Sequence, residues 1–170
     1  MSETVDINLS VNGVAVARSV APRETLADFL RQGLELTGTH TGCEMGVCGA
    51  CLVLVDSRVV HACLMFAVQA DGADVQTIEG LSEQAAIADI QEVFHQRNAL
   101  QCGFCTPGVL MTAHSLLSQG SVPSREDIRD ALSGNYCRCT GYEAIVDAIE
   151  TVARRRAAAE PAAEEVEVDA

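Results

Sequence analysis

The sequence predicts an α+β protein with two domains, a small β-rich domain followed by an all-helical one. Two observations predict this division. Apolar and polar residues alternate in the first part of the chain, which is typical of half-buried strands, whereas from Ser82 the apolar residues recur at helical spacing. We therefore place the first domain at residues 1–78 and the second at residues 79–156.

The β-rich domain is expected to begin with a hairpin. Residues 4–20 alternate around Asn12-Gly13, a dipeptide that favours a two-residue turn between antiparallel strands. Residues 24–33 follow as a short helix that ends at a glycine.

Two more strands are expected to follow further along this domain. Residues 51–68 are strongly apolar around Asp56-Ser57, which predicts two strands joined at that turn, with Cys63 on the second strand. Residues 74–81 are expected to hold a last strand.

The second domain is expected to contain four helices. For three of them, residues typical of helix N-termini mark the expected start. Thr106 and Pro107 suit an N-cap and a first helical position, Ser124 is a second N-cap, and Thr140 with Glu143 forms a capping box. The expected helices span residues 82–98, 106–118, 124–134 and 140–156.

Charge and composition exclude some classes of protein. The net charge of −13 argues against a nucleic-acid partner, because phosphate binding needs clustered Lys and Arg. The first ten residues lack a basic stretch and an apolar run, so we expect a cytoplasmic protein. No segment approaches the ~20 apolar residues of a membrane span. Residues 157–170 hold five acidic residues, no base and no aromatic residue, and are expected to be a disordered acidic tail.

Eight cysteines in such a protein favour metal binding or redox chemistry, because a reducing compartment disfavours disulfides. The first four follow the pattern C-x4-C-x2-C and then a distant Cys, which is the plant-type ferredoxin spacing for a 2Fe–2S cluster. Zinc fits this group poorly, because zinc knuckles usually contribute two ligands each. The four residues are Cys43, Cys48, Cys51 and Cys63.

The second group has the pattern C-x2-C and then, after a long interval, C-x-C. Taken alone, this spacing leaves an iron–sulfur cluster, a zinc site and a redox CxxC open. Each of its two pairs precedes a predicted helix, so an anionic cluster there would face the positive ends of two helix dipoles. The four residues are Cys102, Cys105, Cys137 and Cys139.

The stretches "GCEMGVCGAC", "QCGFCTPG" and "NYCRCTGY", in this order, resemble the small iron–sulfur subunit of the molybdenum hydroxylases. This family includes the xanthine dehydrogenase, aldehyde oxidoreductase and aerobic carbon monoxide dehydrogenase types. The resemblance covers roughly residues 4–155 and includes all eight cysteines. It implies a β-grasp plant-type ferredoxin domain, then a four-helix bundle domain, each holding one 2Fe–2S cluster.

The resemblance also implies partners and a direction of electron flow. A large subunit would hold molybdopterin, expected in the cytosine dinucleotide form, and a medium subunit would hold FAD, in a heterotrimer or its dimer. Electrons would pass from molybdenum to the helical-domain cluster, then to the β-domain cluster, then to FAD. Gln101 is implied to hydrogen-bond the pterin, and Cys139 to be the cluster ligand nearest to it.

Two other functions are weighed against this electron-transfer subunit. A freestanding two-cluster carrier would leave Gln101 and the helical domain without a purpose. A zinc-bound structural module conflicts with the spacing of the first cysteine group. The substrate cannot be inferred, because the residues that select it would lie on the molybdenum subunit.

Overall fold

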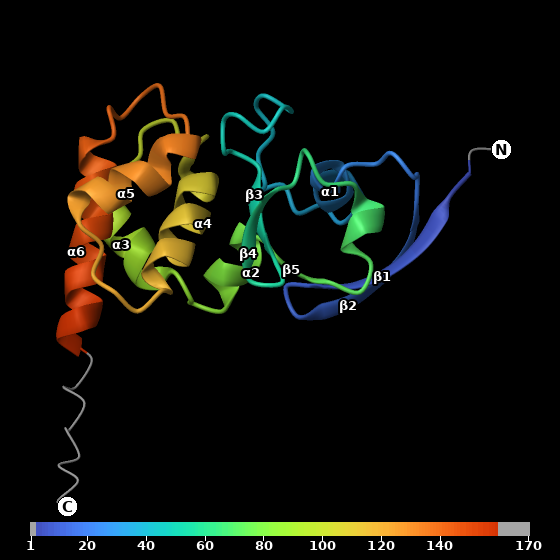
Figure 1. Ribbon diagram of the computed structural model, residues 1–170, viewed down its shortest axis with the longest axis horizontal. Helices are drawn as coiled ribbons and strands as arrows, with labels where there is room; N and C mark the ends of the chain where they lie inside the picture. Colours follow the sequence, from blue (N-terminus) through green and yellow to red (C-terminus); the bar gives the residue numbers. More distant parts are fainter. Residues whose placement is uncertain (1–2, 160–170) are drawn as a thin grey trace, which may run out of the picture.

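The computed structural model describes residues 3–159, which form a β-domain and a helical domain side by side (Figure 1). The β-domain is built on a mixed five-stranded sheet with strand order β2-β1-β5-β3-β4. β1 and β5 are parallel, and the other neighbouring strands are antiparallel. The strands are β1 (Val5–Val11), β2 (Val14–Val20), β3 (Leu52–Val55), β4 (Arg58–His61) and β5 (Asp74–Gln76).

Both expected hairpin turns are present. Asn12 and Gly13 have φ of 53° and 81°, and Asp56 and Ser57 have φ of 48° and 64°, which suits two-residue turns of the primed type. The expected position of Cys63 is wrong. β4 ends at His61, so Cys63 lies in the turn after the strand, where the chain is free to bend toward the first cysteine loop.

A short helix packs on the sheet, as expected, but only its first turn is α-helical. α1 (Leu26–Asp28) is capped by Thr25, whose hydroxyl accepts the Asp28 N–H at 3.1 Å. A π-turn (Phe29–Gly33) continues it to the predicted end. A 3₁₀ turn (Ala67–Ala70) lies between β4 and β5.

The helical domain contains α2 (Ile78–Glu83), α3 (Ala88–Gln96), α4 (Thr106–Leu117), α5 (Arg125–Ala131) and α6 (Glu143–Ala159), with a 3₁₀ turn (Leu132–Gly134) after α5. The prediction of a single helix over residues 82–98 is wrong, because two helices, α2 and α3, cover this stretch. Ala85 has φ of 56°, which ends α2 and separates it from α3.

The expected helix starts were confirmed in one case and corrected in two. Ser124 caps α5, with Asp127 completing the capping box. α4 begins at Thr106 itself, so that residue is not the N-cap. α6 begins at Glu143, and the Thr140 hydroxyl contacts Cys137 Sγ instead of forming a capping box.

Two hydrophobic cores meet at β3, which is buried on both faces. Leu52 and Leu54 belong to the core of the helical domain, whereas Val53 and Val55 belong to the core between the sheet and α1. The alternation of the strand explains this division, because successive side chains point to opposite faces. Figure 1 accordingly places β3 between α4 and α1.

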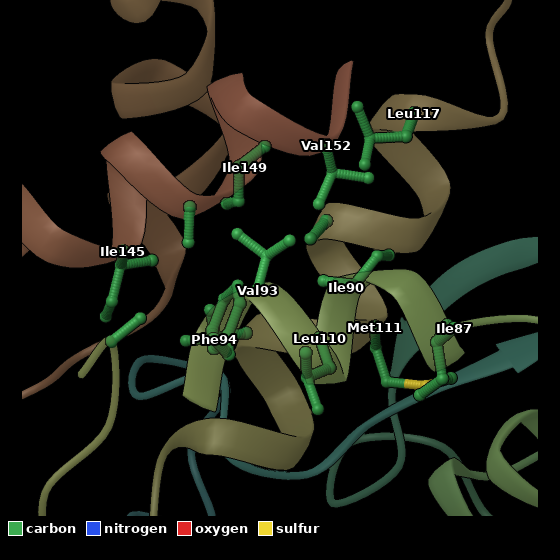
Figure 2. Close-up of a cluster of buried hydrophobic side chains, with 14 of the residues drawn as sticks. Ile87, Ile90, Val93, Phe94, Leu110, Met111, Leu117, Ile145, Ile149 and Val152 are labelled. Atoms are coloured by element: carbon green, nitrogen blue, oxygen red, sulfur yellow. The ribbon is translucent and has the colours of Figure 1, made fainter. Parts of the chain in front are cut away.

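Three long helices enclose the core of the helical domain. Figure 2 shows Val93 of α3 pointing toward Ile149 of α6, and Met111 of α4 beside Ile87, within one hydrophobic cluster. All of these side chains are nearly or completely buried. The second cysteine group is therefore carried by loops anchored on a packed bundle.

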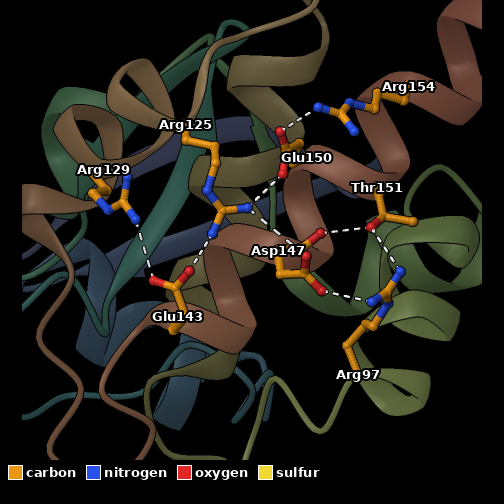
Figure 3. A network of polar contacts seen from close by, with 8 residues as sticks. All are labelled: Arg97, Arg125, Arg129, Glu143, Asp147, Glu150, Thr151 and Arg154. Atoms are coloured by element: carbon orange, nitrogen blue, oxygen red, sulfur yellow. Dashed lines mark hydrogen bonds and ion pairs between the residues drawn. The ribbon is translucent and has the colours of Figure 1, made fainter.

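Ion pairs tie α5 and α6 together beside this bundle (Figure 3). Arg125 pairs with Glu143 and Glu150, and Arg97, just after α3, pairs with Asp147 at 2.9 Å. Exposed pairs of this kind contribute little stability individually. Because Glu143 is the first residue of α6, its pair with Arg125 joins the start of α6 to α5.

The C-terminal part of the expected tail lies outside the described residues, from 160 to 170. Its first three residues, 157–159, complete α6. Within residues 3–159, none of the helices has the length and apolar character that crossing a bilayer requires.

Candidate iron–sulfur sites

The first cysteine loop directs backbone N–H groups at a sulfur. Cys43 Sγ accepts the N–H groups of Met45, Val47 and Cys48 at 3.5, 3.3 and 3.3 Å. Gly46, with φ of 73°, helps the loop to curl around this atom. These three donors lower the pKa of Cys43 to about 6. The loop therefore favours a thiolate, which is the form that ligates iron.

Cys51 and Cys63 form a buried pair behind this loop. The Ala62 N–H, next to Cys63, donates to the Cys51 carbonyl at 3.2 Å. Burial raises the pKa of the Cys51 thiol to about 12, and a hydrogen bond from the backbone of Cys63 partly opposes it. Two thiolates in this place need a nearby cation to compensate their charge.

The second cysteine group also comes together as pairs. Cys102 Sγ and Cys139 Sγ lie 3.6 Å apart at the surface. Burial, together with the neighbouring Cys137, raises the pKa of Cys105 to about 12. Burial opposes ionisation of Cys137 too, but hydrogen bonds from Thr140, Cys139 and Cys105 together outweigh it and lower the pKa of Cys137.

These pairings fit a two-iron cluster at each site. A 2Fe–2S cluster takes four cysteine thiolates, two for each iron, and both groups supply four thiols from two directions. Among residues 3–159, no three Cys, His, Asp or Glu side chains converge at the spacing of ligands for one metal ion. The donors that each group offers to a cluster are free thiols, and Cys102 and Cys139 are one close pair among them.

The two sites are joined by direct contacts between their loops, which lie along the upper edge of the molecule in Figure 1. The Tyr136 N–H donates to the Cys48 carbonyl at 2.9 Å, and Asn135 Nδ2 donates to the Gly49 carbonyl at 3.3 Å. His40 Nδ1 donates to the Phe104 carbonyl at 2.8 Å, and the two rings stack with centroids 4.8 Å apart.

Sequence reasoning singled out Gln101 and missed Tyr142. Gln101 is exposed beside Cys102, and its expected contact with a pterin stays a prediction. The Tyr142 hydroxyl accepts the Cys137 N–H at 2.7 Å and donates to the Asn135 carbonyl at 2.8 Å. These hydrogen bonds depend on a φ of 68° at Tyr142, which the sequence does not reveal. The only signal in the sequence was the place of Tyr142 within "NYCRCTGY".

Comparisons with known proteins assign both halves of the chain. A family described as "2Fe-2S iron-sulfur cluster binding domain" matches residues 9–85, and one described as "[2Fe-2S] binding domain" matches residues 77–150. The caffeine dehydrogenase subunit gamma of Pseudomonas sp. strain CBB1 is 50% identical over 149 residues, which cover 86% of this chain and 89% of the relative. The chain belongs to the small 2Fe–2S subunits of the molybdenum hydroxylases.

Further relatives of this small subunit agree with that assignment. The nicotine 6-hydroxylase small subunit of Paenarthrobacter nicotinovorans is 50% identical over 148 residues, covering 87% of this chain and 89% of the relative. A chain in the crystal structure of quinoline 2-oxidoreductase from Pseudomonas putida 86 superimposes with a TM-score of 0.84 at 47% identity. That match covers 91% of this chain and 98% of the other. The predicted α+β ferredoxin-and-helical fold is thereby confirmed, and the chain is an electron-transfer subunit of a molybdenum-dependent oxidoreductase.

Proposed function

We propose that this subunit conducts electrons from a molybdopterin on a large partner subunit to FAD on a medium partner subunit. The second cysteine group would hold the cluster that receives electrons, and the first group would hold the cluster that delivers them. When bound, each 2Fe–2S cluster takes up and releases one electron at a time by changing one iron between Fe(III) and Fe(II).

One contact carries this proposal. The Tyr136 N–H donates to the Cys48 carbonyl at 2.9 Å, and Tyr136 directly precedes Cys137. A ligand of the second site is thus connected to a ligand of the first by covalent bonds and a single hydrogen bond. Asn135 reinforces the contact through the Gly49 carbonyl, so the loops are held in a fixed relationship.

The two ends of this route reach the surface, which supports delivery to and from partners. Cys102 and Cys139 are exposed, and Gln101 lies next to them in the sequence. At the other end, Met45 is 68% exposed on the loop whose amides surround Cys43. Each end therefore offers a proposed ligand, or a residue of the loop that carries one, to a partner subunit.

The relatives support an expectation for the form of the assembly and for the substrate class. One is named as a subunit gamma and another as a small subunit, so we expect a heterotrimer or its dimer. Caffeine, nicotine and quinoline, which appear in the names of three similar proteins, are nitrogen heterocycles. We expect a substrate of this chemical class, selected by the molybdenum subunit, and a pterin in the cytosine dinucleotide form.

A metal count on the complex purified through a tag on this chain tests the proposal. Iron, molybdenum and zinc are measured on one sample by mass spectrometry, and the subunits are counted on a gel. About four irons and one molybdenum for each chain is the expected result, since each 2Fe–2S cluster carries two irons. Four irons with no molybdenum and no partner subunit would indicate a freestanding carrier, and stoichiometric zinc in place of iron would rule out electron transfer.

A further inference from the structure

The hydroxyl of Thr140 lies against a proposed ligand of the second cluster. Thr140 Oγ1 is 3.0 Å from Cys137 Sγ, and the backbone N–H of Thr140 donates to the same sulfur at 3.4 Å. Sequence analysis placed this threonine in a helix cap, but α6 begins only at Glu143. Its side chain is therefore free for a different contact.

The direction of the hydroxyl hydrogen bond is fixed by its surroundings. The Tyr142 N–H donates to Thr140 Oγ1 at 3.2 Å, so the oxygen already accepts one hydrogen bond. A thiolate that is bound to iron carries no hydrogen and can only accept. The hydroxyl hydrogen consequently points at Cys137 Sγ.

Tyr142 keeps this arrangement in place. Its own hydroxyl accepts the Cys137 N–H at 2.7 Å and donates to the Asn135 carbonyl at 2.8 Å. Asn135 is itself buried, and its Nδ2 donates a hydrogen bond to the Gly49 carbonyl of the first cysteine loop. Tyr142 thus fixes the backbone of Cys137, and Thr140 contacts its sulfur, so the sulfur stays next to the hydroxyl.

The two proposed sites differ in the kind of donor that reaches their sulfurs. At the first site the donors to Cys43 Sγ are the backbone N–H groups of Met45, Val47 and Cys48. At the second site a side-chain hydroxyl adds to the backbone donor on Cys137. A side-chain donor can be removed by substitution, so the sequence at residue 140 controls the electrostatics of that sulfur.

We propose that Thr140 raises the reduction potential of the second cluster by donating a hydrogen bond to Cys137 Sγ. This inference rests on the proposed function, because it requires that Cys137 ligates that cluster. One added electron converts one Fe(III) to Fe(II) and places more negative charge on the sulfurs. A hydrogen-bond donor stabilises the reduced cluster more than the oxidised one. Thr140 acts through Cys137 and is a positioning residue.

The test is a redox titration of the purified complex, with dithionite as the electron source and the EPR signals of both clusters followed separately. Thr140→Val removes the hydroxyl and keeps the branched shape, whereas Thr140→Ser keeps the hydroxyl. We expect the equilibrium constant for reduction of the second cluster to fall about tenfold in Thr140→Val. For one electron this corresponds to a reduction potential that is lower by about 59 mV. Thr140→Ser should restore the wild-type potential, and the first cluster should not change in either variant.

Other outcomes separate the failure of this inference from the failure of the proposed function. An unchanged potential in a fully loaded Thr140→Val complex would overturn the role of the hydroxyl and leave the cluster assignment standing. A Cys137→Ser complex that kept the second EPR signal unaltered would overturn the ligand assignment itself. Tyr142→Phe, which removes no donor to sulfur, should shift the potential less than Thr140→Val does.

A measurement on the wild-type complex covers the case in which Thr140→Val does not retain its cluster. Deuterium ENDOR on the reduced second cluster, after exchange into D₂O, should detect exchangeable deuterons coupled to the cluster. Thr140→Ala, which is smaller than valine, should lose part of this coupling. Absence of any exchangeable coupling in the wild-type complex would refute the hydrogen bond to Cys137.

Discussion

Gly108, in the first turn of α4, packs so closely against Gly49 that a Cβ on Gly108 would lie 1.9 Å from the Gly49 carbonyl oxygen. Gly49 belongs to the first cysteine loop, and Gly108 follows the second CxxC by three residues. The two sites therefore approach each other through bare backbone. The missing side chain at residue 108 is what allows the start of α4 to lie this close to the first cysteine loop.

Gly108→Ala is expected to push the two loops apart and destabilise the subunit by about 1–3 kcal/mol, as overpacking does. Alanine is the better helix former by ~1 kcal/mol, but the clash prevails because its partner is a backbone oxygen that cannot rotate away. Thermal loss of the cluster absorbance in the purified complex measures the effect. Gly134→Ala is the matched control, because a Cβ there meets nothing within 4 Å. Equal midpoints for the two variants would contradict the close packing.

Cys139→Ser should eliminate the second cluster and leave the first intact. Cys139 Sγ lies 3.6 Å from Cys102 Sγ, so its loss leaves one iron with a single thiolate from the chain. Reduction of FAD by a nitrogen-heterocycle substrate should then fall at least 100-fold while the EPR signal of the first cluster persists. Tyr136→Phe is the control, because only the backbone N–H of that residue is used. FAD reduction at the wild-type rate in Cys139→Ser would refute the proposed route.

Asn135→Asp tests the polar link between the domains. Asn135 is 2% exposed, its Oδ1 accepts the Thr112 hydroxyl at 2.8 Å, and its Nδ2 donates to the Gly49 carbonyl at 3.3 Å. Aspartate replaces the donor with a buried oxygen that faces another oxygen, which costs about 1–3 kcal/mol or more. Thr112→Val leaves the contact with Gly49 in place and should cost less. The midpoint of thermal unfolding and the iron content of the two complexes measure the difference, and equal losses would show that Gly49 is not the partner that matters.

Local signals predicted much of the fold, because they act over short stretches of chain. Asn12-Gly13 and Asp56-Ser57 mark turns whose residues adopt positive φ. Ser124 caps its helix as expected. The break at Ala85 had no such signal, since alanine rarely adopts a φ of 56°.

The sequence predicted two groups of cysteines as candidate ligands, but it did not predict their geometry. Cysteine spacing alone pointed to two groups, yet the approach of Cys102 to Cys139 brings together residues that lie far apart in the sequence and depends on the tertiary packing of the helical domain. Thr140 shows why a sequence signal can mislead. A threonine three residues before a glutamate fits a capping box, but the same hydroxyl also suits a sulfur acceptor, and tertiary packing selects the sulfur.

His114 gives the subunit a pH dependence that is separate from both cysteine groups. It lies half-buried on α4, and its Nδ1 has no hydrogen-bond partner among residues 3–159. Burial is the largest cause that lowers the pKa of His114, the nearby Arg156 adds to it, and Asp89 partly opposes it.

The sign of the effect follows from comparing the two states. The unfolded chain binds a proton at His114 near pH 6.5, whereas the folded chain binds it only at lower pH. The stabilisation by the neutral imidazole is therefore present above about pH 6.5 and is lost as the pH falls through the lower folded pKa. Between these two values the slope approaches 1.36 kcal/mol per pH unit for one proton. Thermal midpoints of the complex between pH 7.5 and pH 5.5 should fall less steeply in His114→Gln than in wild type, and His95→Gln, at an exposed position on α3, serves as the control. Identical slopes for wild type and His114→Gln would contradict a buried neutral imidazole at residue 114.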